Sequence, residues 1–273
     1  PKCRTFVMRN YKDIISLSKN ERGIWDLDTI KGCKSGVDAN EKGCYNDCYA
    51  LKTAKRYGID FGNSIERKFL NESHKQQIIN KIERIDMPFI RIGCAGDPSE
   101  NWQHTIDIIN QIRTSSQLSL FDLTSSKQIV IITRHWKLLT CKQLNDIKKY
   151  NICINTSVSA LDSPEMILNS MAQYERLKPY CKSALRVVSC DFNEDNETGK
   201  QMAEIQRKLF KNENIIDTVF RPSKNNIFVT SGIINVKKMG FMKSKALVSK
   251  YNKKAFLGKC ENCLEMCGLT LKN

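Results

Sequence analysis

Short apolar stretches rich in β-branched residues alternate with longer helix-forming stretches along most of this chain. The predicted strands cover residues 87–98, 127–136, 151–162, 182–193 and 215–223, and segments with helical periodicity follow the first four. Residues 25–33, "WDLDTIKGC", supply a further strand at the start of the series. Near-continuous apolar strands that alternate with amphipathic helices are typical of a parallel sheet covered by helices.

We therefore predict an α/β fold with six strand–helix units. Six units are too few for a complete eight-stranded barrel, so the expected architecture is a partial (β/α)6 TIM-type barrel with parallel strands. Ser163 and Pro164 mark the start of one helix, because serine can cap a helix and proline fits its first turn. The expected regions are an N-terminal extension (1–25), the partial barrel (26–225) and a basic, cysteine-rich C-terminal appendage (226–273).

The cysteine content narrows the chemistry. No apolar run approaches the roughly 20 residues that span a bilayer, and no secretory leader opens the sequence, which predicts a soluble, cytoplasmic protein that does not use a membrane. Twelve cysteines would not persist as disulfides in a reducing cytosol, so some are expected to bind metal. Cys141, Cys153 and Cys181 have no partner at ligand spacing and are expected to be small buried hydrophobes.

The chain is strongly basic. Its 44 Lys and Arg against 29 Asp and Glu give a formal charge of +15, which attracts polyanions and above all DNA or RNA. The densest lysine run lies between residues 237 and 259 and also holds Tyr251 and Phe256. The alternative is a solvated lysine face, and a lysine-rich composition can also reflect an AT-rich genome.

Three cysteines follow the first predicted strand. Cys44 and Cys48 are four residues apart, so they are expected on one side of a helix start, with Cys33 reaching across from the preceding loop. The second strand ends in the turn "AGDP", which contains Gly96 and Asp97. Functional groups of a parallel α/β barrel gather at the carboxyl ends of its strands, where His135 and several serines also lie.

These features resemble the radical S-adenosylmethionine (SAM) superfamily, and in particular three-cysteine proteins of phages and mobile elements. The resemblance covers roughly residues 25–223 and rests on the "GC…CYA" stretch and the "AGDP" turn. It implies a [4Fe–4S] cluster on Cys33, Cys44 and Cys48, with SAM on the open iron. It also implies SAM contacts from Gly96 and Asp97 of the turn. On the fourth and fifth strands it implies contacts from Ser157, Ser159, Arg186 and Ser189, for which a structural role is the equal alternative.

The cysteine spacing departs from the family pattern. The superfamily usually shows Cys-x3-Cys-x2-Cys, whereas this chain has ten residues between Cys33 and Cys44 and three between Cys44 and Cys48. The departure concerns Cys33 most. Cys94, beside the "AGDP" turn, is the alternative ligand.

A second cysteine group, Cys260, Cys263 and Cys267, lies near the C-terminus. Three cysteines within eight residues predict a second iron–sulfur cluster or a zinc site, and the remaining alternative is no metal. A zinc site needs a fourth ligand, for which Cys3, Cys94 or a histidine is available.

Two functions follow from this pattern. The first is a radical SAM enzyme that cleaves SAM to generate a 5'-deoxyadenosyl radical, with a reductant protein such as flavodoxin or ferredoxin, and that modifies or repairs nucleic acid or a nucleobase. The second is a non-catalytic zinc or iron–sulfur protein that binds nucleic acid. Motifs of serine hydrolases, phosphate-loop enzymes and dinucleotide-binding enzymes are absent from the sequence.

Overall fold

The fold is built on a seven-stranded sheet in the order β1-β2-β5-β6-β7-β8-β9. A computed structural model of the chain describes residues 13–39, 42–116, 127–235, 240–241, 247–248 and 260–271. Within this seven-stranded sheet, neighbouring strands from β2 to β9 are parallel, and β1 alone is antiparallel to its neighbour, β2. The strands of this sheet are β1 (Leu17–Lys19), β2 (Trp25–Leu27), β5 (Phe89–Ile92), β6 (Gln128–Thr133), β7 (Ile152–Val158), β8 (Lys182–Ser189) and β9 (Ile215–Val219).

The predicted α/β class and the predicted parallel strands are confirmed. Each strand from β5 onward lies inside its predicted range and is a few residues shorter, because the last residues of each range already turn into a loop. β1 was not predicted, and it adds an antiparallel edge from within the expected N-terminal extension. Two small pairs, β3 (Ile30–Lys31) with β4 (Ile65–Glu66) and β10 (Gly240–Phe241) with β11 (Leu247–Val248), complete the strands described.

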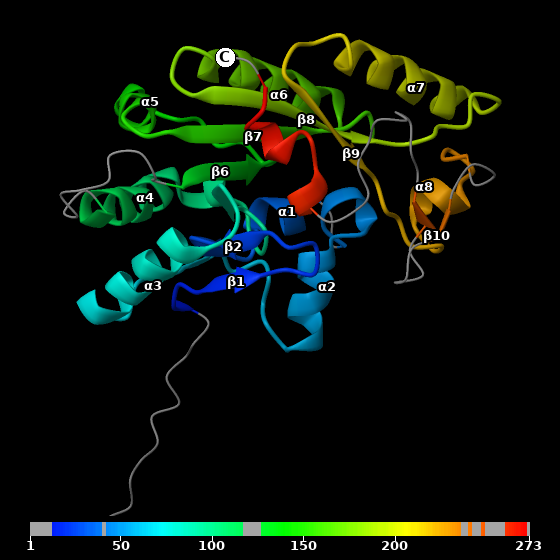
Figure 1. Ribbon diagram of the computed structural model, residues 1–273. Coiled ribbons are helices and arrows are strands. Elements are labelled where there is room, and N and C mark those ends of the chain that lie inside the picture. The colour runs from blue at the N-terminus through cyan, green and yellow to red at the C-terminus, as the bar shows by residue number, and fades with distance from the viewer. Residues whose placement is uncertain are drawn as a thin grey trace, which may run out of the picture.

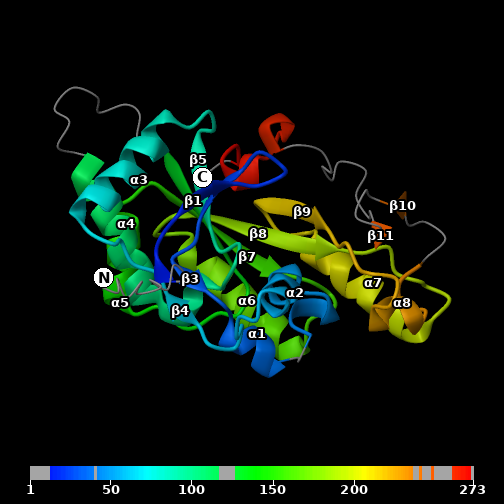
Figure 2. The same ribbon diagram turned by 90° about the horizontal axis from the view of Figure 1, so that it is seen from below.

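Helices α3 to α7 lie in the chain between parallel strands of the sheet, and they cover one side of it in Figures 1 and 2. Side chains cap several of them: Ser163 accepts a hydrogen bond from the Met166 amide at the predicted helix start, and Thr140 forms a reciprocal capping box with Gln143. The helices are α1 (Lys34–Ala39), α2 (Tyr49–Arg56), α3 (Glu72–Arg84), α4 (Trp102–Ser116), α5 (Cys141–Lys148), α6 (Pro164–Leu177), α7 (Glu197–Leu209) and α8 (Ile227–Thr230).

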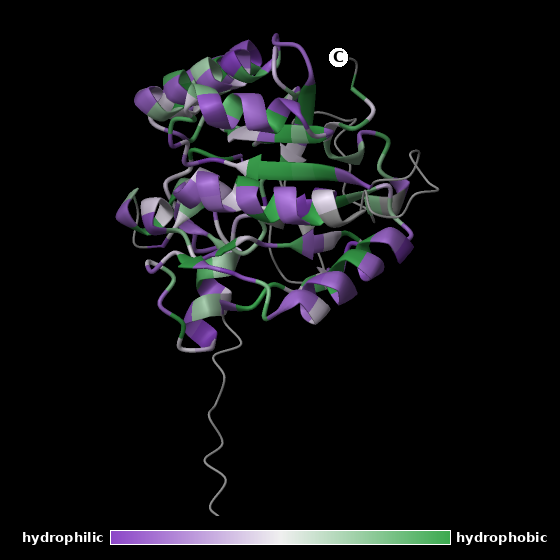
Figure 3. Ribbon diagram, turned by 90° about the vertical axis from the view of Figure 1, so that its left-hand side faces the viewer, coloured by the Kyte–Doolittle hydropathy of each residue, from purple (hydrophilic) through white to green (hydrophobic). Residues whose placement is uncertain are grey.

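The central strand β7 is covered on both faces. On one face, Val158 packs in a cluster with Tyr174 of α6 and with Leu185 of β8. On the other face lie residues 260–271, drawn in red in Figure 2, where Gly268 fits closely against Cys153. Every residue of β7 is therefore buried, including the polar Asn155, Thr156 and Ser157. Figure 3 shows the same arrangement as green strands beside helices that carry purple residues.

One of the cysteines that the sequence predicted to be buried is exposed, and the predicted lysine run cannot be compared with the structure. Cys153 is fully buried, as predicted, but Cys141 is exposed because it is the first residue of α5, on the solvent side of that helix. The lysines between residues 237 and 259 all lie outside the residues described. No helix in the described part of the chain is both long and apolar enough to cross a membrane.

Gly93 is the residue at which β5 turns into the "AGDP" loop. A substitution at Gly93 therefore tests how closely that loop packs against the sheet. Its φ is +100°, and an added Cβ would lie 2.1 Å from the Ile132 carbonyl oxygen. We expect Gly93→Ala to lower the free energy of unfolding by about 3 kcal/mol or more, because left-handed strain adds to a backbone clash. Gly58→Ala is the matched control, since Gly58 has φ +62° and open space around it. Urea unfolding measures both, and equal losses would contradict the close fit.

Candidate functional site

Four cysteines line one cavity at the carboxyl ends of β5, β6 and β7. Its volume is ≈ 140 Å³, and we call it the cysteine cavity. Cys33, Cys44, Cys48 and Cys94 all line it, together with Gly96, Asp97, Arg134, His135 and Ser157. The predicted first cysteine group and the "AGDP" turn therefore meet, because the carboxyl ends of parallel strands face the same edge of a sheet.

The local path of the chain around Cys44 differs from the prediction. Cys44 begins a 3-10 turn, Cys44–Asn46, and Cys48 is the residue that precedes α2. Tyr45 and Asn46 have φ values of 56° and 58°, in the left-handed region, which prevents one continuous helix. The expectation that Cys44 and Cys48 share one side of a helix is therefore wrong, although both still line the cavity.

Glycines make room for two of the sulfur atoms. A Cβ added at Gly36 would lie 2.9 Å from the Cys33 sulfur, and one added at Gly43 would lie 2.5 Å from the Cys48 Cβ. The Gly36 amide also points at Cys33, with 3.2 Å between its nitrogen and Sγ. The sequence carries the signal for this packing, since a glycine stands near each cysteine in "GCKSG" and "GCYNDC".

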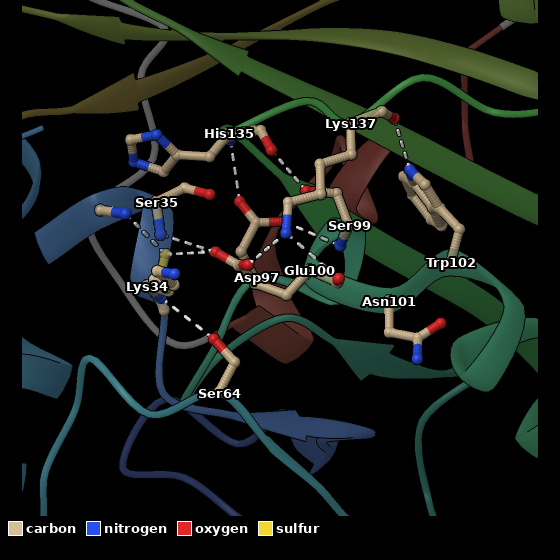
Figure 4. A network of polar contacts seen from close by, with 12 residues as sticks. Lys34, Ser35, Ser64, Asp97, Ser99, Glu100, Asn101, Trp102, His135 and Lys137 are labelled. Carbon is tan, nitrogen blue, oxygen red and sulfur yellow. Dashed lines mark hydrogen bonds and ion pairs between the residues drawn. The ribbon is translucent and has the colours of Figure 1, made fainter. Parts of the chain in front are cut away.

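Asp97 holds two loops of the site together, as Figure 4 shows. One carboxylate oxygen accepts hydrogen bonds from the Ser99 amide at 3.0 Å and the Thr133 hydroxyl at 2.6 Å. The other accepts from the amides of Arg134 and His135, both at 2.9 Å. The carboxylate thus joins the "AGDP" turn to the end of β6, and its contact with the SAM amino group stays a prediction.

Asp28 plays the same part for the loop after β5, and sequence reasoning missed it. Its carboxylate accepts hydrogen bonds from the amides of Gly93, Cys94 and Ala95 at 2.7–3.0 Å. Burial raises the pKa of Asp28, against the opposing effect of these amides. Asp28 lies inside the first predicted strand, residues 25–33, whereas β2 ends at Leu27, so the sequence did not mark it as a strand-end residue.

Glu100 connects α1 to the loop after β6. It accepts a hydrogen bond from the Ser35 amide at 2.8 Å and pairs with the Lys137 ammonium at 2.6 Å (Figure 4). Burial alone would raise the pKa of Glu100, but Lys137 and Ser35 together hold it below its usual value. The Cys33 thiol lies 3.8 Å from the same carboxylate.

The thiols of Cys33 and Cys44 are poor nucleophiles as they stand. Burial raises the pKa of Cys44 to about 11, even though the Arg134 guanidinium acts in the opposite direction. Burial, with Asp97 next in effect, also raises the pKa of Cys33 well above its usual value. Cys44 Sγ lies 3.2 Å from His135 Nε2, and burial followed by Arg134 lowers the pKa of that imidazole. A catalytic thiol needs the opposite shift, so the pair does not resemble a hydrolase nucleophile.

Cys94 stays an alternative to Cys33, because it borders the same cavity. Its sulfur lies 2.7 Å from the Tyr49 hydroxyl and 3.4 Å from Arg91 Nη2. Burial raises its pKa to about 11. Thiolate ligation at any of these cysteines would therefore displace a proton, so metal binding is coupled to pH.

The spacing of the cysteines bears on which kind of metal group the cavity could hold. Among the described residues, no three Cys, His, Asp or Glu side chains lie close enough together to hold one ion. Sulfurs that bind one zinc ion lie about 3.8 Å apart, given Zn–S bonds of about 2.3 Å. A cluster places its thiolates on different iron atoms and so suits cysteines spread around a cavity. Arg134 would supply a positive charge beside such a cluster, because it lines the cavity. The Nε and Nη1 atoms of Arg134 are buried without a hydrogen-bond partner in the part of the chain described.

The residues predicted to contact SAM divide into two sets. Gly96, Asp97 and Ser157 line the cysteine cavity. Ser159 and Ser189 are fully buried elsewhere, where their hydroxyls bond to the Val188 carbonyl and the Asp217 carboxylate. Arg186 is in the middle of β8 and within electrostatic reach of Cys260 and Cys267, with burial lowering its pKa.

The second cysteine group lies against the sheet. The Cys260 amide donates to the Arg22 carbonyl at 2.7 Å, and Asn155 Nδ2 donates to the Cys267 carbonyl at 2.9 Å. Burial raises the pKa of Cys260, and both Cys263 and Cys267 are near enough to add to this effect. The three cysteines therefore interact electrostatically, but they do not form a group close enough to hold one metal ion, and the metal that they were predicted to bind stays a prediction.

Comparisons with models of known protein families, with curated proteins and with solved structures gave no match for this chain. Its function must therefore be inferred from the residues of the site.

Asp97 provides a direct test of the geometry. In Asp97→Asn one acceptor oxygen becomes an NH2 group, so it faces amide donors that it cannot satisfy. We expect the free energy of unfolding to fall by about 3 kcal/mol, measured by urea titration. Asp60→Asn is the control, because Asp60 is exposed and accepts only from the Gly62 amide, a bond that asparagine can keep. If Asp97→Asn lowered the free energy of unfolding by no more than Asp60→Asn, that result would contradict the role of Asp97 in holding the two loops together.

Proposed function

We propose that this chain is a radical SAM enzyme whose [4Fe–4S] cluster binds in the cysteine cavity. The observation that carries the proposal is the meeting of Cys33, Cys44 and Cys48 with the "AGDP" turn around one cavity at the strand ends. Three thiolates leave one iron open, which is the arrangement that SAM requires. The partial barrel belongs to the same proposal, because six parallel strands follow one another in chain order without closing into a ring.

The chain's own residues have five tasks in this proposal. Cys33, Cys44 and Cys48 hold the cluster, and Arg134 balances part of its negative charge. Gly96 lets two backbones approach, since an added Cβ would lie 2.5 Å from the Gly32 carbonyl oxygen. Asp97 fixes the loops, and Phe61 and Ile132 supply apolar walls that exclude water. The bound cofactors would supply the chemistry, which is one-electron reductive cleavage of SAM to methionine and a 5'-deoxyadenosyl radical; the radical would become 5'-deoxyadenosine by taking a hydrogen atom from the substrate.

The second cysteine group enters the proposal as a further iron–sulfur or zinc site. Its support is the electrostatic interaction among the three cysteines and the presence of two half-buried arginines, Arg186 and Arg221, within electrostatic reach of Cys260. Cationic guanidinium groups stabilise thiolates and therefore favour metal binding. A cytoplasmic reductant protein such as flavodoxin or ferredoxin would supply the electron.

The cluster assignment is tested on protein purified without oxygen. We expect iron and sulfide for at least one cluster, and 5'-deoxyadenosine when dithionite and SAM are added. The triple variant Cys33→Ala, Cys44→Ala, Cys48→Ala should lose this product and the SAM-responsive spectrum. The exposed Cys141→Ala is the control and should keep both.

Single variants then separate the two ligand sets. If Cys33 is a ligand, Cys33→Ala loses SAM cleavage and Cys94→Ala keeps it. The reverse result would assign Cys94 instead. A triple variant with unchanged iron content and spectra would refute the site, and fully loaded protein that does not bind SAM in calorimetry would favour the non-catalytic nucleic-acid-binding function.

Nucleic acid is the proposed class of substrate, and its support is the charge of +15 and the lysine run. Changing Lys237, Lys238, Lys253 and Lys254 to glutamine should weaken binding to DNA or RNA. It should also flatten the log–log salt dependence by about 3 units, because each lysine–phosphate contact releases a counterion. Four exposed lysines on other elements are the matched control: Lys142, Lys148, Lys200 and Lys208. Equal slopes for both variants would contradict a specific role of the run.

A further inference from the structure

Helix α2 carries an exposed basic surface that has no role in the proposed cluster binding. Within residues 42–58 the one acidic residue is Asp47, whose side chain is only 5% exposed. The exposed charged residues of this stretch are all basic: Lys42, Lys52, Lys55 and Arg56. A surface of one charge sign attracts a partner of the opposite sign, which here is a polyanion.

Two tyrosines at the ends of α2 expose large parts of their rings. Tyr49 is 62% exposed and Tyr57 is 69% exposed. Among the residues that the structure describes, these are the only exposed Phe, Trp or Tyr side chains. Exposed aromatic rings and exposed cations therefore occur together on this one helix, which points to a partner that offers both flat rings and negative charge.

Tyr49 connects this surface to the cysteine cavity. It lines the cavity although it is largely exposed, so it lies at the mouth of the cavity. Its hydroxyl donates a hydrogen bond to the Cys94 carbonyl at 2.9 Å, which fixes the position of the ring. Binding to a group that is already fixed costs less conformational entropy. Tyr49 is therefore a preformed surface for a flat ring, next to the proposed cluster site.

Helical geometry places cations in line with this ring. Residues i, i+3 and i+7 share one face of a helix, so Lys52 and Arg56 lie in a row with Tyr49. Lys52 is held there by its ion pair with Asp47, and Arg56 has no ion-pair partner in the described part of the chain. The row ends about 10 Å from Tyr49, where Tyr57 follows. We call Tyr49, Lys52, Arg56 and Tyr57 the α2 ridge.

Aromatic rings alternating with cations are the features that bind single-stranded nucleic acid. Bases stack on the rings while phosphates contact the cations, and every base has a face that can stack. A ridge of about 10 Å matches about three nucleotides at a spacing of about 3.4 Å along one strand. A duplex fits the ridge less well, because its bases stack on one another and their faces are not accessible.

We propose that the α2 ridge binds single-stranded DNA or RNA and brings one base to the mouth of the cysteine cavity. As an assignment of where a substrate binds, this rests on the proposed function, because it places the base beside the cluster site. The binding itself does not depend on SAM.

The first test removes a stacking ring. Anisotropy of labelled oligothymidine and oligouridine of about 12 nucleotides measures binding to the whole chain, purified without oxygen. Tyr57→Leu should weaken binding about tenfold, whereas Tyr57→Phe keeps the ring and should bind as the unmodified chain does. The tighter of the two strands identifies DNA or RNA as the preferred ligand. Unchanged binding by Tyr57→Leu, or a duplex of equal length bound as tightly as the single strand, would overturn the proposal.

The second test removes a cation. Arg56→Gln should flatten the log–log salt dependence of single-strand binding by about 0.7, the value for one phosphate contact. Lys55→Gln is the matched control, because Lys55 is also exposed but lies about 100° around the helix, outside the row. Its slope should stay close to that of the unmodified chain. Equal changes for both variants would show a general effect of charge and would overturn the ridge.

Photo-crosslinking locates the bound strand. A strand that contains 5-iodouracil forms crosslinks to aromatic rings that stack on the base, so mass spectrometry should identify Tyr49, Tyr57 or both. Crosslinks confined to Tyr251 and Phe256 would assign the strand to the C-terminal lysine run and overturn the proposal.

The two proposals fail separately. Single-strand binding that depends on the Tyr57 ring, by loaded protein that does not cleave SAM, would refute the proposed function and leave the α2 ridge as a binding surface. SAM cleavage together with unchanged strand binding by Tyr57→Leu would refute the ridge alone.

Discussion

Backbone N–H groups at the carboxyl ends of parallel strands have no partner in the strand ladder, and the whole candidate site depends on how this chain satisfies them. Two buried carboxylates do so. Asp28 accepts from three consecutive amides after β5, and Asp97 accepts from two amides after β6 and one in its own turn. Because buried amides without partners are costly, these bonds fix the loops that carry Cys94, Arg134 and His135. The cavity walls are consequently determined by structure-forming residues before any ligand binds.

The burial of residues around the cavity also controls the protonation state of the thiols of Cys33 and Cys44. The thiols of Cys33 and Cys44 are held protonated by their surroundings, so they do not serve as free nucleophiles at neutral pH. A metal centre changes this balance, since coordination stabilises the thiolate directly and Arg134 lies near enough to Cys44 to assist. Cysteine-lined cavities of this kind therefore suit metal binding better than thiol catalysis.

Periodicity predicted the parallel strands and most of the helices between them, because both patterns are local. The sequence also placed Cys33, Cys44 and Cys48 after the first predicted strand, and all three line the cavity. It failed where the backbone leaves regular geometry: the left-handed Tyr45 and Asn46 interrupt the expected helix. Among the candidate SAM residues, Ser157 lies within β7 and reaches the cavity, whereas Ser159 follows the strand end and turns inward to Val188. Ser189 is an odd number of residues from Arg186 and so faces the opposite side of β8.

Arg91 links the cysteine cavity to the C-terminal cysteine group. Its guanidinium is fixed by two hydrogen bonds to Asp26, at 2.7 and 3.2 Å, and its Nη2 lies 3.4 Å from the Cys94 sulfur. Cys267 is within its electrostatic reach as well; burial acts against the charged form, but Asp26 and the two cysteines outweigh it and raise the pKa of Arg91. One permanently charged, immobile group is therefore shared by both sets of thiols. Since a thiolate at either set is stabilised by the same cation, the position of residues 260–271 on the inner face contributes to the chemistry of the cavity as well as to the packing of β7.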